Sequence, residues 1–155
     1  MPLKQRLPNG GTAYVPSPSE MTAAQQFALL NPNVNTLQDY QQAKIAVLAE
    51  NLQQQYAQGF VSNAVNNTNI TWPFDPTSQA KWSWLASILG AGGTFPTSIQ
   101  VKDINNNVYA VTQTEAQALV SAATAFYLEW DGHYHTQMDS VNSAATIPAV
   151  LAVGW

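Results

Sequence analysis

The sequence predicts a mostly helical α+β fold, in which a small β-hairpin packs with three or more helices behind an extended proline-rich arm and a long helix. Two helix-start signals, Asp75-Pro76 and Thr112-x-x-Glu115, flank an asparagine-rich turn, which predicts the compact part. Recurring prolines and glycines near the N-terminus predict the arm. We therefore expect residues 1–58 to form an arm plus helices for assembly contacts, and residues 59–155 to form a compact α+β domain.

The first twenty residues are the least regular part of the sequence. Their prolines and glycines are Pro2, Pro8, Gly10, Gly11, Pro16 and Pro18. These residues exclude a helix and interrupt any central strand, so the segment should be extended. It is either a disordered tail or an arm laid on another subunit, and we favour the arm. Its candidate interface residues are Leu3, Leu7, Tyr14 and Val15.

Two helices should follow the arm. Ser19 is a plausible cap for a short helix over residues 20–30, and Thr36 for a longer one over residues 37–57, with Gly59 at its end. The apolar stripe of the longer helix is Leu37, Tyr40, Val47, Leu48, Leu52 and Tyr56. Its opposite face is nearly all glutamine, which is unusual for a free surface helix.

The Asp75-Pro76 helix should run to Leu89, after a strand-like stretch over residues 60–74. Its expected buried side is Ala80, Trp84, Leu85, Ile88 and Leu89. Trp82 and Trp84 are two residues apart and so point to different sides of the helix. If Trp84 lies in the core, Trp82 lies at the periphery of the core, at a protein interface or against a ligand, and we treat it as an interface candidate.

A hairpin and a long helix complete the domain. Residues 99–102 and 108–111 read as two strands, and the asparagines between them supply left-handed turn residues. The helix that starts at Thr112 carries the stripe Ala116, Leu119, Val120, Ala123, Phe126, Tyr127 and Trp130. Asp131-Gly132 is a possible kink. A short helix over about 147–153 ends at Trp155, an aromatic residue that we also count as an interface candidate.

Charge is scarce in this chain, and this limits its partners. Charged residues make up 9% of the sequence, against about 25% in an ordinary soluble domain. Amides and hydroxyls supply the polarity instead, which suits a protein packed against neighbours. The net charge is −4 and the five basic residues are scattered, so we expect no nucleic-acid binding. The sequence has no cysteine, no signal peptide and no apolar run of membrane-span length, so we expect no membrane insertion.

No set of residues predicts a catalytic site. His133 and His135 are two apart beside Asp131, a spacing that splits them across different faces of a helix, and a third metal ligand would have to be Asp131 or Asp139. Asp75 and Glu115 are better explained as helix caps. No nucleophile elbow or phosphate-binding loop occurs. We therefore expect no enzyme activity, no metal site and no cofactor.

The stretch from Trp72 to Ala149 resembles a domain of unknown function common in phage tail-associated proteins, including tail-fibre and fibre-assembly proteins. The resemblance covers about residues 59–152. It rests on the Asp-initiated helix with Gln79-Ala80, the end of that helix at Gly90, the Asn-turn hairpin, the Thr-x-x-Glu helix start and the Ala144-Ala145-Thr146-Ile147 segment. The family's first hairpin strand often has Trp where this chain has Gln100-Val101-Lys102.

The resemblance implies a phage virion, assembled in the host cytoplasm, with other phage structural proteins as partners. The first expectation is therefore a structural or adaptor protein at the tail, baseplate or fibre attachment, forming a homo-oligomer within the particle. A receptor- or glycan-binding module that uses exposed aromatics is the second, and a tail-fibre assembly chaperone is the third. The family pattern contains no catalytic residue to carry over.

Overall fold

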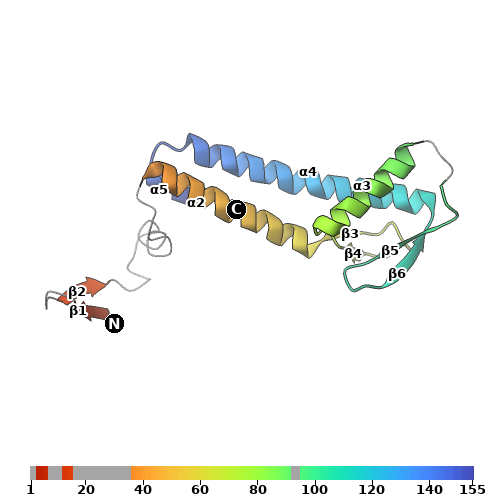
Figure 1. Ribbon diagram of the computed structural model, residues 1–155, viewed down its shortest axis with the longest axis horizontal. Coiled ribbons are helices and arrows are strands. Elements are labelled where there is room, and N and C mark those ends of the chain that lie inside the picture. The colour runs from red at the N-terminus through yellow and green to blue at the C-terminus, as the bar shows by residue number, and fades with distance from the viewer. Residues whose placement is uncertain (1–2, 7–11, 16–35, 92–94) are drawn as a thin grey trace. The chain divides into compact units, whose positions relative to one another are not determined.

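A computed structural model of the chain describes residues 3–6, 12–15, 36–91 and 95–155 (Figure 1). Over this part of the chain the helices are α2 (Leu37–Gln58), α3 (Pro76–Gly90), α4 (Gln113–Ser143) and α5 (Ile147–Ala152). The strands form three antiparallel pairs: β1 (Leu3–Arg6) with β2 (Thr12–Val15), β3 (Phe60–Ser62) with β4 (Ile70–Trp72), and β5 (Ile99–Lys102) with β6 (Val108–Val111). The predicted fold class, mostly helical α+β, is confirmed.

The chain divides into two compact units, and each is described by itself. The first unit comprises residues 1–47 and 137–155, and the second comprises residues 48–136. The unit boundaries therefore fall inside α2 and α4, whereas the sequence predicted a single boundary after residue 58. The first unit contains both ends of the chain, so a single boundary in the sequence cannot separate it from the second.

In the first unit, local signals place the start of α2 where the sequence predicted it. The Asp39 amide donates to the Thr36 hydroxyl at 3.2 Å, and the Thr36 amide donates to the Asp39 carboxylate at 2.8 Å. This reciprocal cap satisfies two amides that the helix itself leaves unpaired. Among the described side chains of this unit, the buried ones are Tyr40, Val141 and Val150, from α2, α4 and α5.

A glutamine of α2 holds the end of α4 in the same unit. The Gln41 side-chain amide donates to the carbonyl oxygens of Val141, Asn142 and Ala144 at 3.1 to 3.3 Å. The last carbonyls of a helix have no partner within the helix. Gln41 therefore ties the first turns of α2 to the end of α4, although 100 residues separate it from Val141.

The N-terminal segment is partly in extended strands, as predicted, but the pairing of these strands was not predicted. β1 and β2 pair antiparallel, with Leu3 opposite Val15 and Lys4 opposite Tyr14. The expected short helix over residues 20–30 lies outside the described residues.

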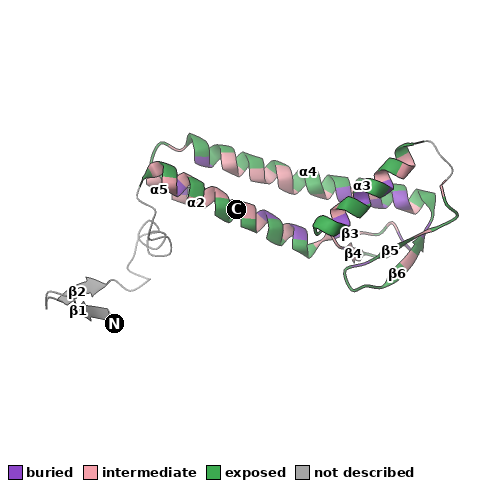
Figure 2. Ribbon diagram, in the orientation of Figure 1, coloured by how far each residue is buried: buried purple, intermediate pink, exposed green. Residues whose placement is uncertain are grey.

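The second unit has an aromatic core. The Phe74 ring lies 5.1 Å from the rings of Tyr56 and Phe126, and Phe60 lies 5.4 Å from Trp82. Burial, and then the charge of Asp131 nearby, raise the pKa of Tyr56 to about 12. Figure 2 shows buried positions on α3 and on the N-terminal part of α4. Edge-to-face contacts of this kind add to the stabilisation from burial itself.

Gly59 connects α2 to β3 at a point where the backbone lies very close to β4. Its φ is +74°, and a Cβ there would lie 2.2 Å from the Trp72 carbonyl oxygen of the paired strand. Only glycine adopts this backbone without strain, and only glycine leaves room for that oxygen. The helix end that the sequence assigned to Gly59 is thus also a point of close approach to β4.

The remaining elements follow the predicted bounds. α3 begins after the Asp75 cap with Pro76 in its first turn, and α4 begins at the Thr112–Glu115 capping box. β5 and β6 occupy the two predicted ranges, and Asn106 in their loop has a φ of +67°. α4 continues as one helix through Asp131-Gly132, where the sequence suggested a kink.

Candidate binding cleft

Helix α3 presents two different stripes. Ser78, Trp82 and Leu85 follow the i, i+4, i+7 spacing of one helix face, and all three are buried. One residue earlier in each turn lie Thr77, Lys81 and Trp84, which are exposed and line an open cleft. Ser78, Trp82 and Leu85 also border the cleft, so α3 contributes both buried and exposed residues to its lining.

The predicted orientation of α3 is wrong for its two tryptophans. Trp82 is 7% exposed and belongs to the core, while Trp84 is 55% exposed. The Trp82 indole N–H donates to the Pro73 carbonyl at 2.9 Å, and its ring packs against Phe60 and Trp72. The N–H of a buried indole usually has such a partner, and here Pro73 supplies it just before the helix. The interface candidate on this helix is therefore Trp84.

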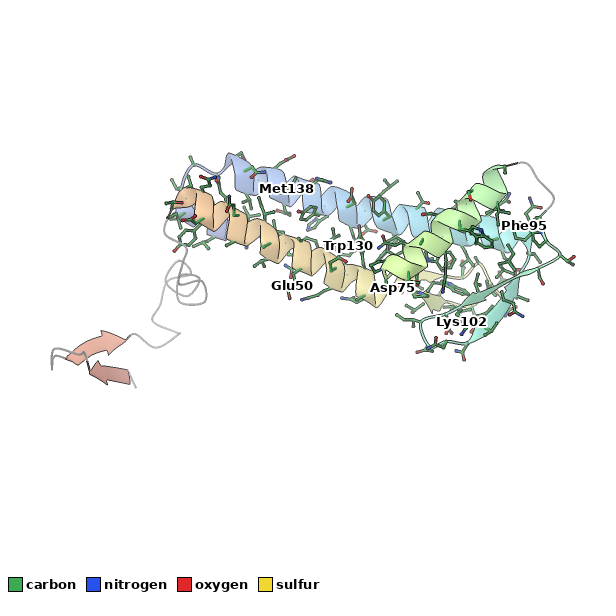
Figure 3. The ribbon with its side chains drawn as sticks, in the orientation of Figure 1. Glu50, Asp75, Phe95, Lys102, Trp130 and Met138 are labelled. Carbon is green, nitrogen blue, oxygen red and sulfur yellow. The ribbon has the colours of Figure 1, made fainter. Side chains whose placement is uncertain are left out.

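The cleft has a volume of about 570 Å³ and lies between α3 and the β5–β6 hairpin. This is within the range of ligand-binding pockets, about 300–1,000 Å³. β5 lines it along its whole length, from Ile99 to Lys102, and Ile104 and Val108 extend the apolar part of the lining. Val108 is 54% exposed. Figure 3 shows Asp75 at the start of α3 and Lys102 on β5, from the two elements that form the cleft.

A buried aspartate shapes the hairpin wall of the cleft. Asp103, 6% exposed, accepts hydrogen bonds from the amides of Asn105 and Asn107 at 2.8 and 2.9 Å and from the Asn107 side chain at 2.8 Å. The Tyr109 hydroxyl donates to it at 3.3 Å. Burial alone would raise the pKa of Asp103, but the hydrogen bonds from Asn107, Asn105 and Tyr109 outweigh burial and lower it. The carboxylate is thus charged and fully engaged within the loop.

The same loop is fixed to the neighbouring strand pair. The Ile104 amide donates to the Thr71 carbonyl of β4 at 3.0 Å. The Cδ1 atom of Ile104 lies 3.4 Å from the position that a Cβ on Gly59 would occupy. This contact links the β5–β6 loop to β4 and so positions the hairpin wall. The sequence predicted the turn, but it did not predict that a buried carboxylate organises it.

The charged residues that line the cleft differ in whether they have partners within the protein. Both of its aspartates have internal partners: Asp75 caps α3 by accepting from Thr77 and Ser78, and Asp103 binds its own loop. Lys81 and Lys102 have no ion-pair partner among the described residues. The cleft lining therefore carries two negative and two positive charges, and the two lysines are the charges without a partner among the described residues.

The other predicted interface residues are placed as follows. Leu3, Tyr14 and Val15 belong to β1 and β2, and their side chains lie outside the described part of the structure, as does the whole of Leu7. Trp155 is half-buried. All of these residues belong to the first unit of the chain, whereas the residues that line the cleft belong to the second.

The residues considered for catalysis or metal binding do not form a site in the part of the chain that the structure describes. His133 and His135 lie on α4, and His135 faces Asp131 at 3.6 Å, one turn earlier. No group of three or more His, Cys, Asp and Glu residues converges within residues 36–91 and 95–155 or the two N-terminal strands. Glu115 and Asp75 are helix caps, as the sequence predicted.

Within the described residues, no helix combines the length and the apolar character that crossing a membrane requires. Comparison with curated proteins and with solved structures gives no match. A family model does match, over residues 39–151, so the match begins inside α2 rather than at residue 59 as the resemblance suggested. The chain belongs to the family described as a domain of unknown function, DUF4376.

Proposed function

We propose that this protein is a non-enzymatic structural or adaptor protein of a phage particle, at the tail, baseplate or fibre attachment, and that it binds a partner protein through the cleft between α3 and β5. The exposure of Trp84 carries the proposal. An indole with 55% of its surface open, beside the exposed Val108 and Ile104, is an apolar surface that a partner would cover.

The composition supports the same proposal. With 9% charged residues, the chain lacks the charged surface that keeps free proteins apart. The resemblance to phage tail-associated proteins, noted from the sequence, supplies the particle context. The N-terminal arm would add further contacts, so a chain without residues 1–20 should fold but fail to enter the particle.

Mass spectrometry of purified phage particles tests this function. We expect the protein at a fixed ratio to other particle proteins, and reduced incorporation of Trp84→Ala at unchanged stability. Leu128→Ala is the matched control, because Leu128 is 62% exposed but lies on α4 and does not line the cleft. Absence of the wild-type protein from particles would refute the proposal, as would turnover of peptidoglycan, polysaccharide or nucleotides that is lost on changing one carboxylate.

A glycan-binding function is the second candidate. The exposed Trp84 ring shares the cleft with Gln100 and Asn106, and an aromatic face beside amide groups is a common arrangement for binding sugars. Saturable binding of host surface polysaccharide that Trp84→Ala abolishes would favour it over the adaptor function.

A further inference from the structure

The β5 edge that borders the cleft has unpaired backbone groups. The Asp103 amide donates to the Asn107 carbonyl at 3.0 Å, so these two residues form a hydrogen-bonded pair next to Lys102 opposite Val108. Hydrogen-bonded and non-hydrogen-bonded pairs alternate along an antiparallel ladder. The amide and carbonyl groups of Gln100 and Lys102 therefore point away from β6.

A contact already described supports this assignment. Ile104 follows Lys102 in the same alternation, and its outward amide donates to Thr71 of β4. No backbone partner is present for Gln100 or Lys102 among the described residues, and the sheet has two strands. The outward backbone groups are thus paired at Ile104, just beyond β5, and unpaired at Gln100 and Lys102, which line the cleft.

We propose that an extended, acidic segment of a partner protein adds to β5 as a third strand. Main-chain hydrogen bonds to an open sheet edge are a recurring way of binding peptides. In an added strand, residues opposite Gln100 and Lys102 lie on the same sheet face as these side chains, within reach of the Lys102 ammonium group. Lys81, across the cleft on α3, is the second free cation.

Charge argues for an acidic partner rather than for the arm of a second copy. The arm carries Lys4 and Arg6, which the free lysines of the cleft would repel. Lys81 and Lys102 have no partner among the described residues and can pair with added carboxylates, whereas Asp75 and Asp103 already accept hydrogen bonds within the protein. The inference rests on the proposed function, since it specifies the partner segment that an adaptor would bind.

Synthetic capped peptides test the inference on the purified full-length protein. They are roughly seven residues long, within the usual length of a strand. One alternates valine with glutamate, one alternates valine with lysine, and one is the acidic peptide with every second backbone nitrogen methylated. Titration is followed by NMR at the backbone amides of Gln100 and Lys102. Ala110, whose amide points to the opposite edge of the hairpin and which does not line the cleft, is the control.

We expect the acidic peptide to shift the Gln100 and Lys102 amides, and the basic and methylated peptides to bind at least several-fold more weakly. Gln100→Pro removes one outward amide without breaking the β5–β6 ladder and should weaken binding about threefold to tenfold. Ala110→Pro is its matched control. Lys102→Gln and Lys81→Gln should each weaken the acidic peptide about twofold to fivefold, and Lys44→Gln on α2 should not.

Several outcomes would overturn the inference: equal binding of the acidic and basic peptides, equal binding of the methylated peptide, a shift at Ala110 instead of at Gln100 and Lys102, or no binding at all. The methylated peptide keeps the test decisive if Gln100→Pro fails to fold. A gluco-oligosaccharide that shifts the Trp84 indole and leaves the β5 amides unmoved would assign the cleft to sugar instead. These results do not depend on particle incorporation, so a failure here is distinct from a failure of the proposed function.

Discussion

Replacing Trp82 by alanine should destabilise the protein far more than replacing Trp84. Trp82 is 7% exposed, packs edge-to-face on Phe60 at 5.4 Å and donates a hydrogen bond to Pro73. Removing a buried tryptophan costs about 3–5 kcal/mol, a large share of the roughly 5–15 kcal/mol that stabilises a typical domain. Trp84 leaves 55% of its surface in solvent, so Trp84→Ala should cost about 1 kcal/mol or less.

Thermal unfolding of the full chain, followed by circular dichroism, measures the difference. At about 2–4 °C per kcal/mol, Trp82→Ala should lower Tm by roughly 6–20 °C and Trp84→Ala by only a few degrees. Trp82→Phe keeps most of the ring but loses the hydrogen bond to Pro73, and should fall between them. If Trp84→Ala lowers Tm as much as Trp82→Ala, the assignment of the two faces of α3 is wrong, and the binding role of Trp84 loses its support.

Two further perturbations test the local structure. Gly59→Ala should destabilise the fold by at least about 1–3 kcal/mol, because alanine is strained at a φ of +74° and its Cβ would meet the Trp72 carbonyl; an unchanged urea midpoint would contradict this. The Ser78 hydroxyl, followed by the Ser78 and Thr77 amides, lowers the pKa of Asp75, so the charged cap stabilises the fold at pH values above the ordinary aspartate pKa, and this stabilisation is lost as the pH falls through the lowered value. Asp75→Asn keeps a capping side chain that does not titrate, and its Tm should therefore fall less than that of the wild type between pH 7 and pH 3.

The helix starts and the hairpin could be predicted because their causes are local. Thr36, Asp75 and Thr112 each cap a helix through residues two or three positions away, so a short stretch of sequence contains both partners. The two strands of the hairpin were likewise recognised from alternation around an asparagine turn. Contacts of this range are the ones that sequence patterns record.

The face of α3 could not be predicted in the same way. Trp84 shares helical spacing with several apolar residues, and so does Trp82, with Leu85 and the small Ser78. The choice between them depends on Pro73 and on aromatic rings from other elements, which spacing within the helix does not contain. The cleft was missed for the same reason, because it is formed where α3 and the β5–β6 hairpin meet, and spacing within one element does not contain that contact. The Asp103 loop did leave a signal, an aspartate followed by asparagines, which is typical of side-chain to backbone turns.

The contact of Gln41 with the end of α4 has a consequence for the conditions that this protein can withstand. Many helices place a cation near their last carbonyls, and the attraction weakens as salt screens it. Here a neutral amide donates to three carbonyls, and it neither titrates nor gathers counterions. We therefore expect the contact between the first turns of α2 and the end of α4 to have the same strength at low and at high salt concentration. This contact should therefore depend less on ionic strength than a contact between a lysine or arginine and the same carbonyls would.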